Sequence, residues 1–282
     1  MPNEVVKYNN DLNKLEFKGF EQEDFDLLMA ICARMRDLDE EVQIFEYSYL
    51  MDLVNWDKTQ RVKLFDDALK RMNNKLATIK ADIILKDGRE ATLVLFPTFI
   101  RDSKNRTLEV SVNPRFKFIL NDLTANFTRF ELKEYVDLEG RYAKQLYTQI
   151  KQRYRLKGSF MEVSVDELRQ MLSIPESYSV KEITRSIVVP AATLIKSCKG
   201  LHELEITIIK AARRGCPVKG YRFTWTAPKQ IPGQLHIDDA LAPDNPKTTK
   251  RKPKKNKFNE YDQRQYTASD YDDLEERKIG KL

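Results

Sequence analysis

Histidine is scarce in this 282-residue chain, which contains only His202 and His236. Two histidines so far apart form neither a pair of metal ligands nor a Ser-His-Asp arrangement. The three cysteines, Cys32, Cys198 and Cys216, are an odd number without CxxC spacing. That pattern argues against a disulfide scaffold and against a zinc site. These shortages remove the commonest metal-dependent and disulfide-based classes of protein.

Phosphate-binding loops are also missing, because the nine glycines form neither GxxxxGK[ST] nor GxGxxG. The adjacent acidic pairs 66–67, 238–239 and 272–273 do not replace a metal site. Neighbours on a helix diverge by about 100 degrees, so such pairs cannot jointly hold an ion. The sequence therefore predicts a protein that is not an enzyme and that binds no cofactor.

A signal peptide and an apolar run long enough to cross a bilayer are both absent from the sequence. We therefore expect a cytoplasmic protein with no membrane partner. The charge is high but nearly balanced, with 49 basic and 43 acidic residues, a net charge of +6 and a pI near 9.0. This small excess of positive charge favours a polyanionic partner only weakly. A basic surface would therefore require basic residues to be clustered locally.

One order of elements occurs twice along the chain. An amphipathic helix is followed by a strand, a short helix, a longer basic helix and a two-stranded ribbon, which is the order of a winged helix. The first copy begins at residues 20–37 and the second at residues 138–155. Leu50 of the first copy lies 118 positions before Leu168 of the second. The predicted fold class is therefore α+β, with two tandem winged-helix domains.

In the first copy, apolar residues at helical spacing run from Phe25 to Met35. A strand is expected at 42–46, Ser48 is expected to cap the next helix, and Asp57 the one after it. Strand-like runs follow at residues 81–86, 91–100 and 106–113, with Asp87-Gly88 as a tight-turn signal between the first two. The first two runs are interpreted as the ribbon.

In the second copy the sequence pattern of a winged helix is clearer. Its first helix carries the stripe Tyr142, Leu146, Ile150 and Tyr154, and a strand is expected at 160–165. Ser164 and Glu167 match a capping box. A long helix over 179–198 contains Pro190, which predicts a bend or a break. The ribbon is expected at 201–211 and 220–226.

These patterns predict four parts. They are an N-terminal arm at 1–18 with a short strand near 15–17, a winged helix at 19–122, a second winged helix at 123–227, and a tail at 228–282. The tail has several prolines, a basic run at 247–257 and an acidic block, which is typical of a flexible, disordered interaction segment.

Basic and polar residues gather on two elements of both copies, the ribbon and the longer basic helix, which is the second helix of the helix-turn-helix. These are the elements that contact DNA in winged helices. Any one of these residues alone is more often part of a solvated helix face than a DNA contact, and it is the clustering that supports DNA binding. In the second copy they are Ser179, Lys181, Thr184 and Arg185 on the helix, and Arg213, Arg214, Lys219 and Arg222 on the ribbon; in the first copy they are Lys58, Thr59, Gln60, Arg61 and Lys63 on the helix, and Lys86 and Arg89 on the ribbon.

On three segments the chain resembles the iteron-binding plasmid replication initiator (Rep) family. They are NNDLNKLEFKGFEQEDFDLLMAICARMRD near the start, FTRFELKEYVDLEGRYAKQLYTQIKQ at the bridge, and SIVVPAATLIKS with the ribbon RRGCPVKGYRFTW. The segments keep the family's order between Val5 and Thr226, and the tail lies outside the resemblance.

The resemblance implies two winged helices related by a pseudo-twofold axis. It implies binding of double-stranded DNA, as a monomer at direct repeats in a plasmid origin and as a dimer at an inverted repeat in the protein's own operator. The second domain would make the main sequence-specific contacts. The first would add DNA contacts and would form the dimer interface through its strands, with the run at residues 91–100 as the candidate interface. Origin opening would rely on host initiator or helicase proteins.

Two other functions fit the same residues. One is a transcriptional repressor with no role in replication. The other is a winged-helix scaffold for replisome proteins, in which only the basic tail binds nucleic acid.

Overall fold

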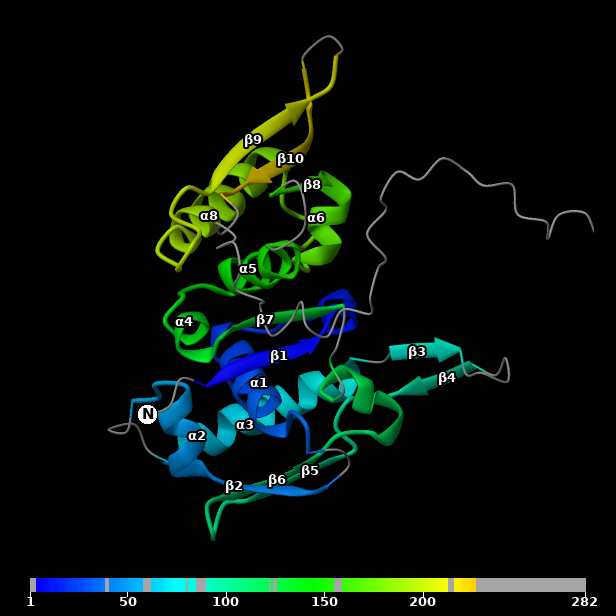
Figure 1. The fold of residues 1–282 in the computed structure, drawn as a ribbon, viewed down its shortest axis with the longest axis vertical. Coiled ribbons are helices and arrows are strands. Elements are labelled where there is room, and N and C mark those ends of the chain that lie inside the picture. Colours follow the sequence, from blue (N-terminus) through cyan, green and yellow to red (C-terminus); the bar gives the residue numbers. More distant parts are fainter. Residues whose placement is uncertain are drawn as a thin grey trace, which may run out of the picture. The chain divides into compact units, whose positions relative to one another are not determined.

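The structure is a computed structural model in which two copies of one arrangement are recognised (Figure 1). It describes residues 4–38, 41–57, 62–79, 81–84, 90–121, 123, 126–154, 159–212 and 216–226, with the backbone alone for 81–84 and 90–93. The predicted tail therefore lies outside the described residues.

Each copy consists of a strand, a short helix, a long helix, and then the winged-helix elements. The first copy contains β1 (Val5–Asn9), η1 (Asn10–Lys14), α1 (Gln22–Met35), β2 (Gln43–Glu46), α2 (Tyr47–Leu53), α3 (Val62–Thr78), β5 (Thr98–Asp102) and β6 (Thr107–Ser111). The second contains β7 (Phe127–Glu131), α4 (Leu132–Val136), α5 (Arg141–Arg153), β8 (Phe160–Ser164), α6 (Val165–Met171), α7 (Val180–Glu182), η3 (Ile183–Val188), α8 (Val189–Ile195), β9 (Glu205–Lys210) and β10 (Val218–Thr224).

The two winged-helix sheets have the same topology. Their strand orders are β2-β6-β5 and β8-β10-β9, so in each copy the first strand pairs with the last. The short helices α2 and α6 begin at Tyr47 and Val165, which keeps the predicted offset of 118 residues. Two tandem winged helices of the α+β class are thereby confirmed.

The first ribbon lies later in the chain than predicted. Residues 81–84 and 90–93 form a separate two-stranded sheet, β3 (Ala81–Ile84) with β4 (Glu90–Leu93), while β5 and β6 hold the ribbon position. The apolar run 91–100 that suggested one strand is interrupted at Pro97, which cannot donate to a ladder. The run is therefore divided between two sheets.

The N-terminal segment is part of the folded core. The strand predicted near residues 15–17 is not formed; the strand lies at β1 and pairs antiparallel with β7 of the second copy. Val6 and Tyr8 alternate with more exposed residues and are fully buried on one face of this pair. The polarity of the segment hid this alternation of only two core residues.

Three expectations about the helices had different outcomes. The capping box of Ser164 and Glu167 is confirmed at the start of α6. Helix α2, however, begins one residue before Ser48, with Glu46 at the N-cap position. Pro190 does not break its helix, because helical backbone continues from α7 through the π-helical segment η3 into α8.

Three hydrogen bonds join positions that are 118 residues apart, and so join equivalent sites of the two copies. The Thr128 hydroxyl donates to Asn10 Oδ1 at 2.8 Å, and the Gly140 N–H donates to Gln22 Oε1 at 2.8 Å. The third is the ion pair of Lys144 with Asp26, at 2.5 Å. Contacts between equivalent positions arise at a twofold axis. These three bonds therefore locate the pseudo-twofold junction.

Lys144 is the most completely buried charge at the junction, with 0% of its side chain exposed. Its ammonium also donates to the carbonyl oxygens of Tyr135 at 2.6 Å and Val136 at 3.3 Å, and it lies 4.7 Å from the centre of the Tyr135 ring. Burial raises the pKa of Asp26 to about 7 and lowers the pKa of Lys144. Both shifts show that burial acts against the charged forms, so the pair depends on its mutual contact.

We predict that Lys144→Met lowers the free energy of unfolding by about 3–5 kcal/mol, because it leaves the buried carboxyl group of Asp26 without the cation that compensates it. The double variant Asp26→Leu/Lys144→Met should recover most of that loss, since it removes both charges together. Urea unfolding monitored by tryptophan fluorescence measures both. Equal destabilisation of the single and double variants would contradict this account of the junction.

Among the described residues, no helix has the length and apolar composition needed to cross a bilayer.

Candidate nucleic-acid interface

The longer basic helix of the second winged helix, which runs from α7 through η3 into α8, begins with a complete capping box. The Ser179 hydroxyl accepts the Glu182 N–H at 3.3 Å, and the Glu182 carboxylate accepts the Ser179 N–H at 2.7 Å. The hydrogen bonds from Ser179 lower the pKa of Glu182. Ser179, predicted as a DNA contact, thus has its hydroxyl engaged in starting the helix.

Thr184, also predicted to contact DNA, holds the helix against the ribbon. Its hydroxyl lies 2.9 Å from the Val180 carbonyl oxygen, to which it donates, and 2.7 Å from the hydroxyl of Tyr221. Tyr221 is fully buried on β10. Thr184 therefore fixes the position of the helix, whatever contact it also makes with a ligand.

Lys181 and Arg185 are exposed and four residues apart on this helix. Positions four apart lie on the same side of a helix, so the structure brings these two predicted cations together. The nearby N–H of Val189 donates to the carbonyl of Thr184, five residues back, which is the π-helical register. Such one-turn π segments occur frequently at functional sites.

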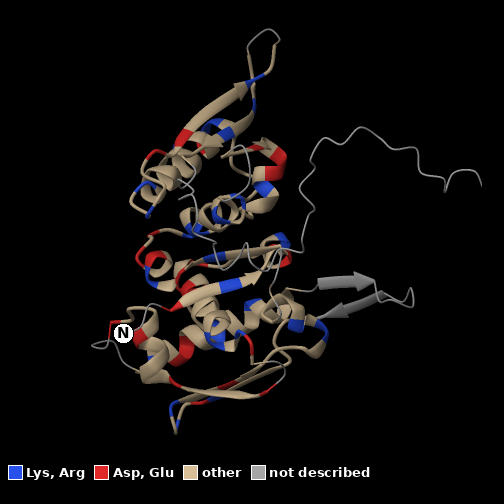
Figure 2. Cartoon of the chain, viewed as in Figure 1, with Lys and Arg blue, Asp and Glu red and all other residues tan. Residues whose placement is uncertain are grey.

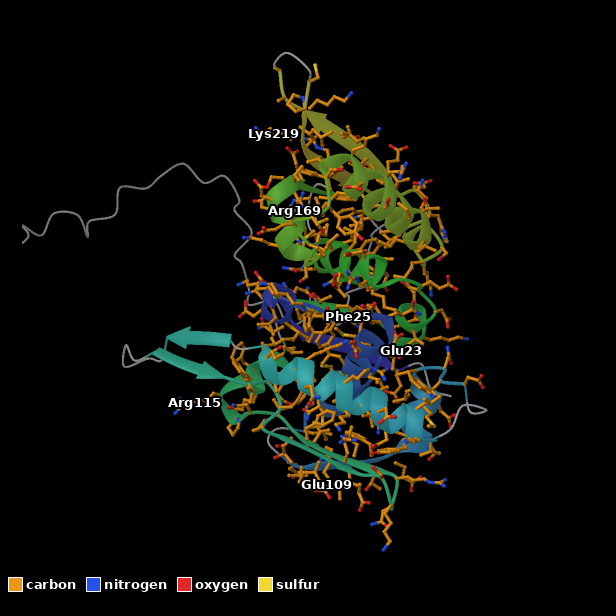
Figure 3. The ribbon with its side chains drawn as sticks, turned by 180° about the vertical axis from the view of Figure 1, so that it is seen from behind. Glu23, Phe25, Glu109, Arg115, Arg169 and Lys219 are labelled. Atoms are coloured by element: carbon orange, nitrogen blue, oxygen red, sulfur yellow. The ribbon has the colours of Figure 1, made fainter. Side chains whose placement is uncertain are left out.

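On the ribbon of the second domain, Lys219 is exposed close to the end of the β9–β10 pair (Figure 3). Arg222 is half-exposed and is already paired with Glu162 of β8, with its Nη2 atom 2.7 Å from Oε2. A phosphate contact by Arg222 would compete with that pair. Arg213 and Arg214 lie outside the described residues.

In the first domain, Lys63 is exposed in the first turn of α3. Lys58, Thr59, Gln60 and Arg61 precede that turn and lie outside the described residues, as do Lys86 and Arg89. The last two belong to the segment between β3 and β4, which is not the ribbon of the winged helix. Any DNA contact by them would be made from a separate hairpin.

The β5–β6 turn carries two exposed cations, Lys104 and Arg106, which are not among the predicted DNA contacts. The Asp102 carboxylate accepts the N–H groups of Lys104 and Asn105, each at 2.9 Å, which shapes the turn. These hydrogen bonds, that of Asn105 first, lower the pKa of Asp102. The sequence DSKNR, at residues 102–106, is rich in turn-forming residues and is the signal from which this tip of the first domain's ribbon could have been predicted.

Helix α3 also shows why counts of basic residues mislead. Lys70 is exposed, but Arg71 pairs with Glu23 at 3.2 Å, and Lys75 pairs with the buried Asp24 at 2.5 Å. Basic and acidic residues are interspersed over both domains (Figure 2). Counting basic residues therefore does not show which of them are available to a polyanion.

Within the part of the chain that the structure describes, no three His, Cys, Asp or Glu residues gather as metal ligands. Cys32 and Cys198 are buried and Cys216 is exposed, all as free thiols. Burial raises the pKa of Cys198 to about 11 and that of Cys32 to about 12. The two buried thiols therefore stay protonated and act as core residues.

Two family models together match most of the described chain. The description "Initiator Replication protein, WH1" matches residues 5–151, and "Initiator Rep protein, WH2" matches residues 164–225. The chain belongs to the initiator replication protein family. The suspected resemblance to Rep initiators with two winged helices is thus confirmed, and with it membership in a family of DNA-binding proteins.

A curated relative supports the same membership. The "Probable replication protein rep" of Bifidobacterium longum (strain NCC 2705) is 36% identical over 228 residues, which cover 80% of this chain and 73% of the relative. Among solved structures, the Pi initiator protein in complex with iteron DNA aligns with a TM-score of 0.60 and 15% identity, covering 82% of this chain and 100% of that one. At that identity, the match supports the fold.

We predict that Ser179→Ala weakens both the fold and DNA binding, whereas Ser164→Ala weakens only the fold. Each serine caps a helix through the same box, so each loss should cost about 1 kcal/mol of stability. Only Ser179 begins the helix that carries Lys181 and Arg185. Thermal unfolding and a DNA titration on both variants test this; equal affinity losses would argue against that helix as the contact.

Proposed function

We propose that the protein initiates plasmid replication by binding direct repeats, or iterons, at the origin. The observation that carries this proposal is that one chain holds two winged helices of identical topology, joined by a buried junction. A winged helix presents its second helix to one major groove, so two in tandem suit two successive grooves of one duplex. Membership in the initiator family and the likeness to an initiator solved with iteron DNA support the proposal.

In this proposal the cations divide into two roles. Arg185 and Lys181 read base edges from the second domain, since Arg and Lys suit guanine. Lys219, Lys63, Lys104 and Arg106, together with the predicted cations outside the described residues, contact phosphates and position the protein. The protein itself performs no catalysis; it opens the origin and recruits host initiator or helicase proteins in the cytoplasm through protein contacts.

The first experiment is a mobility-shift titration with the direct repeats nearest the gene and a scrambled duplex of equal length. One shifted band per repeat is expected, with affinity falling by about 10³ to 10⁵ between 50 and 200 mM salt if six to ten phosphates are contacted. Equal binding to both duplexes would overturn the proposal. Plasmid maintenance by the gene and its repeats alone separates an initiator from a repressor that has no replication role.

We predict that Arg185→Ala weakens binding to the repeat by about 1–3 kcal/mol and relaxes the preference at one base pair. Lys219→Ala should weaken binding to all sequences alike, as a phosphate contact does. Arg34→Ala is the control, because Arg34 is an exposed helix arginine that pairs with Glu4 at 3.0 Å. Fluorescence anisotropy on matched and mismatched repeats measures the three; uniform weakening by Arg185→Ala would reassign it to phosphate.

A homodimer that represses the protein's own promoter at an inverted repeat is part of the proposal, in equilibrium with the monomer. The outer face of the β2-β6-β5 sheet supports a dimer contact in the first domain. Ile44 and Ile100 lie on either side of Glu109 in one cross-strand row and are 65% and 53% exposed. The equivalent row of the second domain carries Glu162, Arg222 and Thr207.

We predict that Ile100→Lys weakens dimerisation by about 100-fold, because a charge buried without a partner costs several kcal/mol. Binding of the monomer to a single repeat should be unchanged. The matched control is Ile208→Lys, at an aliphatic residue that is 39% exposed on the ribbon of the second domain. Sedimentation equilibrium measures the dimer constant; unchanged dimerisation of Ile100→Lys would remove this face from the proposal.

A further inference from the structure

Val189 is an exposed aliphatic residue in the middle of the helix that carries Arg185. It is 46% exposed, and it lies between two exposed polar residues, Arg185 four positions before it and Thr193 four positions after it. Lys181, Arg185, Val189 and Thr193 thus follow one another at four-residue spacing along one side of the helix. The Thr193 hydroxyl is turned back onto the Val189 carbonyl oxygen, at 2.9 Å. The stripe therefore combines two cations with one apolar surface.

The packing of the helix does not require a valine at this position. The buried positions of this helix match those of α3 in the first domain, and the offset between the matched positions increases by one residue inside η3. The pairs are Phe65 with Ile183 at 118 positions, and then Leu69 with Val188, Met72 with Ala191 and Leu76 with Ile195 at 119 positions.

Two consequences follow from that change of offset. The second domain has one residue more than the first between Ile183 and Val188, and the π-helical turn accommodates it. After the insertion, the position equivalent to Val189 is Lys70 of α3, an exposed lysine. Since the same fold takes a lysine there, core packing does not select the valine, and its side chain is available to the surface of the second domain.

Among the four bases, thymine alone presents a methyl group in the major groove. An aliphatic side chain between two polar ones matches such a methyl group, whereas it offers nothing to a phosphate or to a hydrogen-bonding base edge. We propose that Val189 reads the 5-methyl group of a thymine in the repeat, next to the base contacted by Arg185. This inference rests on the proposed binding of direct repeats and adds a specificity-determining residue to it.

The test is a uracil scan of the repeat with the full-length protein. Each thymine is replaced in turn by uracil, which removes only the methyl group, and binding is measured by fluorescence anisotropy. Loss of one buried methyl group should weaken binding about fourfold at one position or two adjacent ones. Val189→Ala should bind thymine and uracil repeats equally, and Val189→Ile should keep the preference.

Val42→Ala is the matched control, because Val42 is 52% exposed in the first domain and undergoes the same truncation. It should keep the full response to uracil. A flat scan with the unaltered protein, or a uracil response that survives in Val189→Ala, overturns the assignment of Val189 while leaving repeat binding intact. Equal binding of the thymine repeat and a scrambled duplex overturns the proposed function instead, and the two failures are thereby distinguished.

Discussion

The buried ammonium of Lys144 is the constraint on which the arrangement of the two winged helices depends. Its partner Asp26 occupies the equivalent position of the other copy, 118 residues earlier. In a symmetric homodimer, a residue at the axis meets its own copy, and two lysines or two aspartates would repel each other there. When the two copies are parts of one chain, their sequences can differ, so the two equivalent positions at the axis can carry opposite charges. The junction is thus a contact that a single chain permits and an identical pair of subunits does not.

The fold could be predicted wherever local pattern and burial agree. The stripe Leu146–Ile150 on α5 and the capping box at Ser164 were both visible in the sequence and are both confirmed. The pairing of β1 with β7 was not visible, because it joins residues more than 100 positions apart and places only Val6 and Tyr8 in the core of the first strand. The ribbon of the first copy was misplaced because the inserted hairpin β3–β4 carries the same turn signal that a ribbon would.

The site was predictable at the level of elements and less so at the level of side chains. Sequence showed which helix and ribbon are basic, but not that Arg222 is paired with Glu162 or that the Thr184 hydroxyl reaches Tyr221. Such partners come from other strands and helices, so no spacing rule along the chain reveals them. Val189 was overlooked for the opposite reason, since an apolar residue in an apolar helix looks like core until its exposure is known.

The two copies have diverged at their surfaces while keeping one core. On the outer sheet face, the first domain has isoleucines where the second has Glu162 and Thr207. On the second helix the contrast is reversed, with Lys70 in the first domain and Val189 in the second. Phosphate contacts bind DNA of any sequence with similar strength. Basic residues on α3 of the first domain would therefore add affinity without discriminating between sequences. In the proposed mode of binding, discrimination comes from the second domain, which is the copy that carries the inserted residue and the exposed valine.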